Sequence, residues 1–175
     1  MSLSEKIDSA AERLGLLARE THHVIVSAES CTGGMVAQSI TAVSGSSAWF
    51  EGAWVVYTPE AKSRQLDVDP RLIESAGVVS EAVASAMAAG ALARSVGATL
   101  SVSLTGVAGP TGGTKATPVG TVCVGWAHRF NEHIVTYART YYFEGTRQGI
   151  RQWASLRALE GLEAIMENKN PLEMG

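Results

Sequence analysis

The sequence predicts an α/β fold in which a mixed, mostly parallel sheet is sandwiched between helices. Two observations lead to this prediction. Amphipathic segments, with apolar residues at three- and four-residue steps, alternate with short apolar runs through most of the chain. Two strand candidates then follow one another directly, which indicates an antiparallel pair within the sheet. No linker or repeat divides the sequence, so we expect one domain over residues 1–175 with an ordered core at about 4–167.

Apolar spacing and the positions of glycine and proline predict the N-terminal elements. Apolar residues at helical steps, beginning at Ile7, indicate an amphipathic helix, and a run of small apolar residues then indicates a buried strand. Two adjacent glycines open the next helix, and Pro59 suits the first turn of the one after it. The expected elements are a helix at 4–21, a strand at 24–28, a helix from 33 to 43, a strand near 53–57 and a helix at 59–66.

The C-terminal elements have clearer boundary signals. Ser80 is a typical N-cap residue for a long Ala-rich helix, and Gly97 is a typical stop. Apolar residues between Ile150 and Ile165 mark the buried face of a last helix. The expected elements are a turn at 67–70, a helix at 81–96, strands at 99–104, 119–127 and 134–143, and a helix at 146–166.

Composition excludes several classes of protein. The chain has 175 residues, 14 of them Lys or Arg and 17 Asp or Glu, so its net charge of −3 lacks the positive field of a nucleic-acid binder. No apolar stretch is long enough for a membrane span, and the N-terminus does not resemble a signal peptide, so we expect a cytoplasmic protein. Two cysteines make no disulfide framework. Apolar helices and four tryptophans leave room for a homo-oligomer, with a dimer favoured.

A polar segment follows the first predicted strand, where ligands bind in open α/β sheets. It reads Glu29-Ser30-Cys31-Thr32-Gly33-Gly34. Glycines at the start of a helix allow close approach of a ligand, and the unpaired N–H groups there attract an anion or an oxyanion. An ordinary turn with Ser30 or Thr32 as N-cap explains the same residues. Cys31 is a possible nucleophile, but without a paired histidine it is better interpreted as a small buried residue.

Two further segments are candidates for the same site. Residues 105–114 hold four glycines and three threonines, which suits phosphate binding but also a flexible loop, and they match neither a Walker A loop nor a dinucleotide fingerprint. Lys62, one helical turn beyond Tyr57, becomes a general base only if burial or nearby positive charge lowers its pKa from about 10.4. From the residues alone, a solvated lysine and a packed tyrosine are the favoured interpretation. Arg147 and Arg151 share one helix face and can meet an anion. The histidines lack metal-ligand spacing, so we predict no metal.

Taken together, these segments resemble the CinA C-terminal family over nearly the whole chain. The matching motifs are Glu-Ser-Cys-Thr-Gly-Gly at 29–34, Tyr-x-x-Glu-Ala-Lys at 57–62 and Thr-Gly-x-Ala-Gly-Pro-x-Gly-Gly-Thr at 105–114. The resemblance implies a three-layer α/β/α sandwich and a stand-alone domain. It also implies hydrolysis of the carboxamide of nicotinamide mononucleotide to nicotinate mononucleotide and ammonia, in NAD recycling, without metal or organic cofactor. The alternative is a non-catalytic module of the competence/damage-inducible type that binds a nucleotide or a protein partner.

The resemblance also implies roles for individual residues. Ser30 would be the nucleophile, Lys62 its base and Tyr57 a proton relay. The residues expected to bind substrate are Glu29, Cys31, Thr32, Gly33, Gly34, Thr105, Gly106, Gly109, Pro110 and Arg147. Of these, Arg147 would contact the phosphate or ribose side. We expect the backbone N–H groups around Thr32–Gly34, at a helix N-terminus, to form the oxyanion hole.

Overall fold

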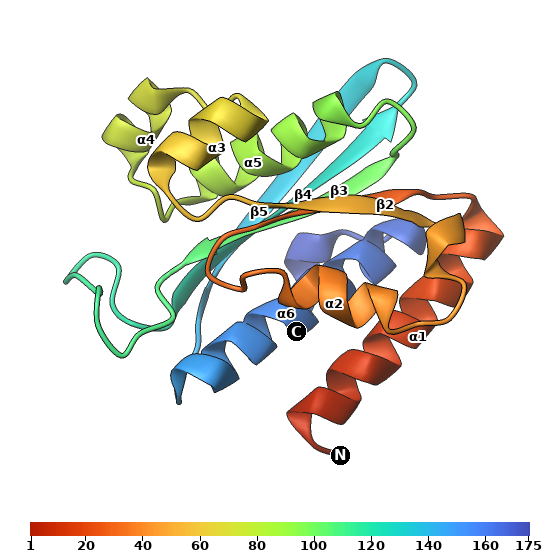
Figure 1. Cartoon of the computed structure of the whole chain (residues 1–175), viewed down its shortest axis with the longest axis horizontal. Coiled ribbons are helices and arrows are strands. Elements are labelled where there is room, and N and C mark those ends of the chain that lie inside the picture. Colours follow the sequence, from red (N-terminus) through yellow and green to blue (C-terminus); the bar gives the residue numbers. More distant parts are fainter.

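The chain forms a three-layer α/β/α sandwich, shown in Figure 1. The computed structural model describes all 175 residues. The helices are α1 (Leu3–Thr21), α2 (Met35–Thr41), α3 (Pro59–Leu66), α4 (Pro70–Ala76), α5 (Glu81–Arg94) and α6 (Arg147–Met166). The strands are β1 (Ile25–Glu29), β2 (Phe50–Val55), β3 (Leu100–Gly106), β4 (Thr121–Phe130) and β5 (His133–Tyr142). None of the helices is long and apolar enough to cross a membrane.

The five strands form one mixed sheet in the order β2–β1–β3–β4–β5. β1 lies between β2 and β3 and is parallel to both, whereas β4 pairs antiparallel with β3 and β5 pairs antiparallel with β4. Four of the five strands therefore run in the same direction and only β4 is reversed. This confirms the predicted mixed, mostly parallel sheet and the antiparallel pair at its end.

Helices cover both faces of the sheet and close two hydrophobic cores. α1, α2 and α6 lie on one face, and α3, α4 and α5 lie on the other (Figure 1). The first face buries a cluster of 26 apolar residues, and the second face buries 13. β1 serves both cores because neighbouring side chains of a strand point to opposite faces: Ile25 belongs to the first cluster and Val26 to the second.

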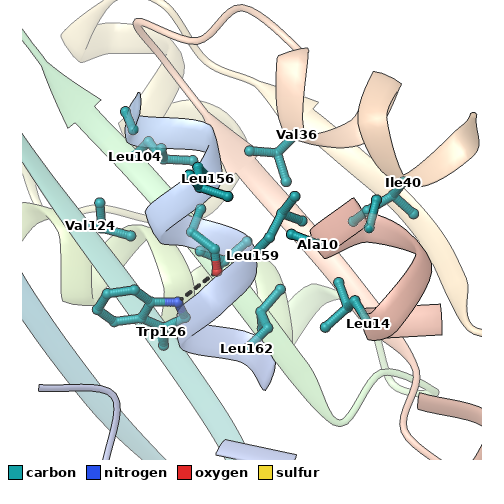
Figure 2. Packing of buried hydrophobic residues seen from close by; sticks show 14 of the residues in the cluster. Ala10, Leu14, Val36, Ile40, Leu104, Val124, Trp126, Leu156, Leu159 and Leu162 are labelled. Atoms are coloured by element: carbon teal, nitrogen blue, oxygen red, sulfur yellow. Dashed lines mark hydrogen bonds between the residues drawn. The ribbon is translucent and has the colours of Figure 1, made fainter. Parts of the chain in front are cut away.

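The larger core is built where α6 crosses the sheet. Figure 2 shows Leu156, Leu159 and Leu162 of α6 among side chains of β3, β4, α1 and α2. The Trp126 indole N–H donates to the carbonyl of Ala158, 3.1 Å away (Figure 2). Gly161 makes this packing possible, because a Cβ at that position would lie 2.2 Å from the indole ring.

Two elements differ most from the sequence-based expectation. Apart from Pro70, which ends the predicted turn at 67–70, α4 lies in a segment for which no element was predicted; none of its residues is fully buried, so apolar periodicity could not reveal it. Its signals are local instead, since Pro70 begins the helix and the Asp69 side chain accepts the N–H of Arg71 at 2.9 Å. β2 begins three residues earlier than expected, at Phe50, and ends at Val55. Only every second residue of this edge strand is partly buried, so no continuous apolar run marks its bounds in the sequence.

Candidate active site

The candidate site lies where three parallel strands end at the same edge of the sheet. β1 ends at Glu29, which is in register with Val55 of β2 and Leu104 of β3. The chain leaves β1 towards β2 on one side and returns as β3 on the other, so this edge is a topological switch point of the kind where α/β proteins bind ligands. Ser30 is the first residue after the central strand of the three.

Glu29 is fully buried and organises the turn that carries Ser30. One carboxylate oxygen accepts the Thr32 hydroxyl at 2.7 Å and the N–H of Val36 at 3.0 Å, and the other accepts the N–H of Ala37 at 3.0 Å. The N-cap residue of α2, Gly34, has no side chain to cap the helix, so Glu29 accepts the N–H groups of Val36 and Ala37 from the preceding strand. This carboxylate therefore supports the turn from behind and does not line a pocket.

Ser30 and Lys62 are in direct contact. Lys62 Nζ lies 3.0 Å from Ser30 Oγ and 3.1 Å from the carbonyl oxygen of Val56, and both side chains are buried. Thr58 caps α3 by accepting the N–H of Ala61 at 3.1 Å, and Pro59 fills the first turn. Burial lowers the pKa of the Lys62 amine from its usual 10.5 to about 8. At that value a neutral amine, able to accept the serine proton, is accessible near neutral pH.

Tyr57 and Arg147 meet at the outer rim of the site. The Arg147 guanidinium donates to the Tyr57 hydroxyl at 3.0 Å and also to the carbonyl of Gly109. The Tyr57 side chain is 61% exposed, and its hydroxyl bonds to neither Ser30 nor Lys62. Tyr57 contributes its backbone to the interior instead, since its carbonyl lies 3.5 Å from Ser30 Oγ.

Arg151, on α6, supports the turn that follows Ser30. Its guanidinium donates to the carbonyls of Cys31 at 3.1 Å and Thr32 at 3.0 Å. Sequence spacing allowed this arginine to meet an anion together with Arg147. It does not line the pocket; its Nε and Nη2 donate to the turn and its Nη1 donates to the side chain of Gln148. Burial raises the pKa of the neighbouring Cys31 thiol to about 11, so Cys31 is a protonated thiol at neutral pH.

A pocket of about 290 Å³ opens above the Ser30–Lys62 pair. Its charged side chains are Lys62 and Arg147, and it contains no carboxylate, so its electrostatic potential favours an anionic ligand. A larger hollow of about 900 Å³ lies over α3 and α4, but its one serine, Ser63, has no buried base beside it. The smaller pocket is therefore the candidate active site.

A comparison with protein families identifies the family of the whole chain. The model of the CinA C-terminal domain matches residues 7–166. The chain belongs to the CinA C-terminal domain family.

Relatives of this CinA domain include enzymes and solved structures. The chain is 42% identical to a nicotinamide-nucleotide amidohydrolase, PncC, of Pseudomonas putida over 158 residues, which are 90% of this chain and 96% of the relative. It is 41% identical to the nicotinamide-nucleotide amidohydrolase PncC of Escherichia coli K12 over 93% of this chain and 92% of the relative. The crystal structure of the competence/damage inducible protein CihA from Agrobacterium tumefaciens superposes with a TM-score of 0.85 at 36% identity, covering 91% of this chain and 95% of that one.

The CinA pocket brings together most of the residues singled out in the sequence. Those that line it are Ser30, Cys31, Tyr57, Lys62, Thr105, Gly106, Gly109 and Arg147. Those that lie outside its lining are Glu29, Thr32, Gly33, Gly34 and Pro110.

Sequence reasoning missed one wall of the CinA pocket. Val78 and Val79 line it from the segment before α5. The Thr105 hydroxyl holds this segment in place by donating to the carbonyl of Val78 at 2.8 Å. Two valines before a helix cap carry no sequence signal of a binding site, so only the fold could reveal them.

Proposed function

We propose that this protein hydrolyses the carboxamide of nicotinamide mononucleotide, giving nicotinate mononucleotide and ammonia for pyridine-nucleotide recycling. The observation that carries the proposal is the 3.0 Å contact between Ser30 Oγ and the buried amine of Lys62 in a pocket without acidic residues. A serine beside a lysine of lowered pKa is a known arrangement for nucleophilic attack on an amide. The named activity of the PncC relatives supports the choice of substrate.

The reaction begins with attack by Ser30. Its Oγ bonds to the carboxamide carbon, its proton passes to Lys62 Nζ, and the electron pair of the C=O bond moves onto the oxygen. When that pair returns, the C–N bond breaks, and the nitrogen takes the proton from Lys62 and leaves as ammonia. Water then attacks the ester, giving one proton to Lys62, which passes it to Ser30 as nicotinate mononucleotide departs. This direct transfer does not require Tyr57 as a relay, because Lys62 already contacts Ser30.

The charge of the pocket suits a phosphorylated substrate. Arg147 lies at the rim and presents its guanidinium to the entrance, where it can pair with a phosphate. The nucleotide brings a dianionic phosphate to this cation, whereas the corresponding riboside brings only its positively charged ring. We therefore expect the nucleotide to be hydrolysed in preference to the riboside.

The decisive experiment is incubation of the purified protein with nicotinamide mononucleotide while ammonia and nicotinate mononucleotide are measured. Ser30→Ala should abolish product formation without lowering the melting temperature, and Ser47→Ala, at an exposed serine outside the pocket, should leave it unchanged. Full activity in Ser30→Ala would contradict the serine assignment and direct attention to Cys31. Ligand-induced stabilisation of the wild-type protein without turnover would favour a binding module instead.

A further inference from the structure

Two consecutive backbone N–H groups of buried residues that line the pocket have no acceptor in the protein. They belong to Ala108 and Gly109, which follow the end of β3 and line the same pocket as Ser30. Both residues are buried, and neither N–H donates a hydrogen bond to a backbone or side-chain oxygen. Unpaired buried N–H groups are rare because each one loses its hydrogen bond to water without a replacement. Their presence in a pocket points to a ligand oxygen as their acceptor.

The backbone around these two groups is fixed by other hydrogen bonds. Val107 donates its N–H to Thr121 at 2.8 Å and accepts the N–H of Gly120 at 2.8 Å. The carbonyl of Gly109 accepts from Arg147. Gly109 also has a φ of +75°, and a left-handed residue after an ordinary one turns consecutive N–H groups to the same side. The two donors are therefore held in place before any ligand arrives.

Several other backbone donors near Ser30 are already engaged. At the start of α2, the N–H groups of Val36 and Ala37 donate to Glu29. The N–H of Gly33 donates to the carbonyl of Ser30 at 2.9 Å. The N–H groups of Thr32 and Gly34 have no acceptor, but neither residue lines the pocket, so the expected oxyanion hole at Thr32–Gly34 lies away from the ligand. Cys31 does line the pocket, and its N–H, which also has no acceptor, is a third donor beside Ser30.

We propose that the N–H groups of Ala108 and Gly109 form the oxyanion hole of this enzyme. The inference rests on the proposed amide hydrolysis. When Ser30 Oγ bonds to the carboxamide carbon, the C=O electron pair becomes a full charge on oxygen, and two fixed N–H donors stabilise that charge more than the neutral carbonyl. Gly109 then has two functions, since its carbonyl binds Arg147 while its N–H faces the reacting oxygen.

The test replaces a single N–H by oxygen without changing a side chain. Gly109→glycolic acid, introduced by nonsense suppression, removes the Gly109 donor; the carbonyl of Ala108, which becomes an ester, accepts no hydrogen bond that could be weakened. The matched control is Gly113→glycolic acid, which makes the same chemical change at an exposed glycine outside the pocket lining. We expect kcat for nicotinamide mononucleotide to fall about 100- to 1,000-fold in the Gly109 ester. KM and the affinity for nicotinate mononucleotide should stay near their wild-type values, as should all the constants of the control.

Two further measurements keep the inference falsifiable. Ala108→lactic acid, with Ala116→lactic acid as its control, removes the second donor and should lower kcat in the same way. Its ester carbonyl is that of Val107, which accepts the N–H of Gly120, so the lower kcat counts for the donor only where the melting temperature is unchanged. Equal kcat values in each ester and its control overturn the oxyanion assignment while leaving the amidase proposal intact. A wild-type protein that produces no ammonia overturns the proposed function and this inference together.

Discussion

At the scale of single residues, Lys62 is the most unusual group in the protein. Its amine is buried, forms no ion pair and contacts only the neutral oxygens of Ser30 and Val56. Burying an amine without a counter-charge is unfavourable for the ammonium form, and this lowers its pKa to about 8. Such a residue has no evident structural benefit, whereas a neutral amine beside a serine hydroxyl is what nucleophilic catalysis needs.

The lowered pKa of Lys62 predicts how activity depends on pH. The base must be neutral, so kcat/KM should rise about tenfold per pH unit below pH 8 and level off above it. The sign follows from the base role, because protonation at lower pH removes the acceptor of the serine proton. Initial rates between pH 6 and pH 10, with substrate well below KM, would give the profile. A flat profile through pH 8 would contradict the assignment of Lys62 as the base.

Replacing Lys62 separates its catalytic role from a structural one. Lys62→Met keeps the length of the side chain and removes the buried amine, so activity should disappear. The free energy of unfolding should stay the same or rise by about 0.5 to 2 kcal/mol, as when an active site loses a functional but destabilising group. Urea denaturation measures the second quantity. A large loss of stability would instead show that the Lys62 contacts hold the fold together.

At the scale of secondary-structure elements, one carboxylate links β1 to α2. Glu29 ends the strand and accepts from the first turns of the helix, so the turn that carries Ser30 is held between them. The sequence marks Glu29 only as a polar residue beside a candidate nucleophile. Its cap on α2 depends on how the chain turns after the strand, which residue spacing alone does not determine.

Glu29→Gln should therefore destabilise the first turn of α2 and lower the activity of the site. A glutamine presents one acceptor and one NH₂ group, so one backbone N–H of α2 would face a second donor. We expect a loss of about 1 to 3 kcal/mol in unfolding free energy, together with a lower kcat. Glu51→Gln, at an exposed position on β2, serves as the control in urea denaturation and in steady-state kinetics. Unchanged stability in Glu29→Gln would mean that the carboxylate does not cap the helix.

At the scale of the whole molecule, the sequence predicts much of the architecture but only part of the site. Apolar periodicity reveals the long helices and the buried strands, whereas α4 places only the partly buried Leu72 and Ile73 against the core and gives no such signal. Because the carboxyl ends of parallel strands lie at one edge of a sheet, the sequence correctly suggested that the segments after β1, β2 and β3 converge. The donors at Ala108 and Gly109 could not be foreseen, because an unpaired N–H is a property of the folded backbone.

The opposite end of the sheet holds a pair of histidines that should control stability in acid. The rings of His23 and His128 lie 5.3 Å apart, His128 packs on Phe130, and a ring nitrogen of His23 lies 2.8 Å from the Thr99 hydroxyl. Burial lowers the pKa of both imidazoles below 6.5, and the proximity of His23 lowers that of His128 further. In the window below pH 6.5, the unfolded chain then binds more protons than the folded one, so the free energy of unfolding must decrease as pH falls through it.

Replacing one member of this pair should reduce that dependence. In His128→Gln, the urea midpoint should fall less between pH 7 and pH 5 than in the wild-type protein, because one group that must stay neutral in the fold has been removed. His133→Gln alters an exposed histidine of β5 and should keep the wild-type slope. The same slope in His128→Gln as in the wild-type protein would show that other groups cause the acid sensitivity. Since Ser30 and Lys62 lie at the far end of β1, kcat at pH 8 should be equal in both variants, which separates a loss of stability from a loss of catalysis.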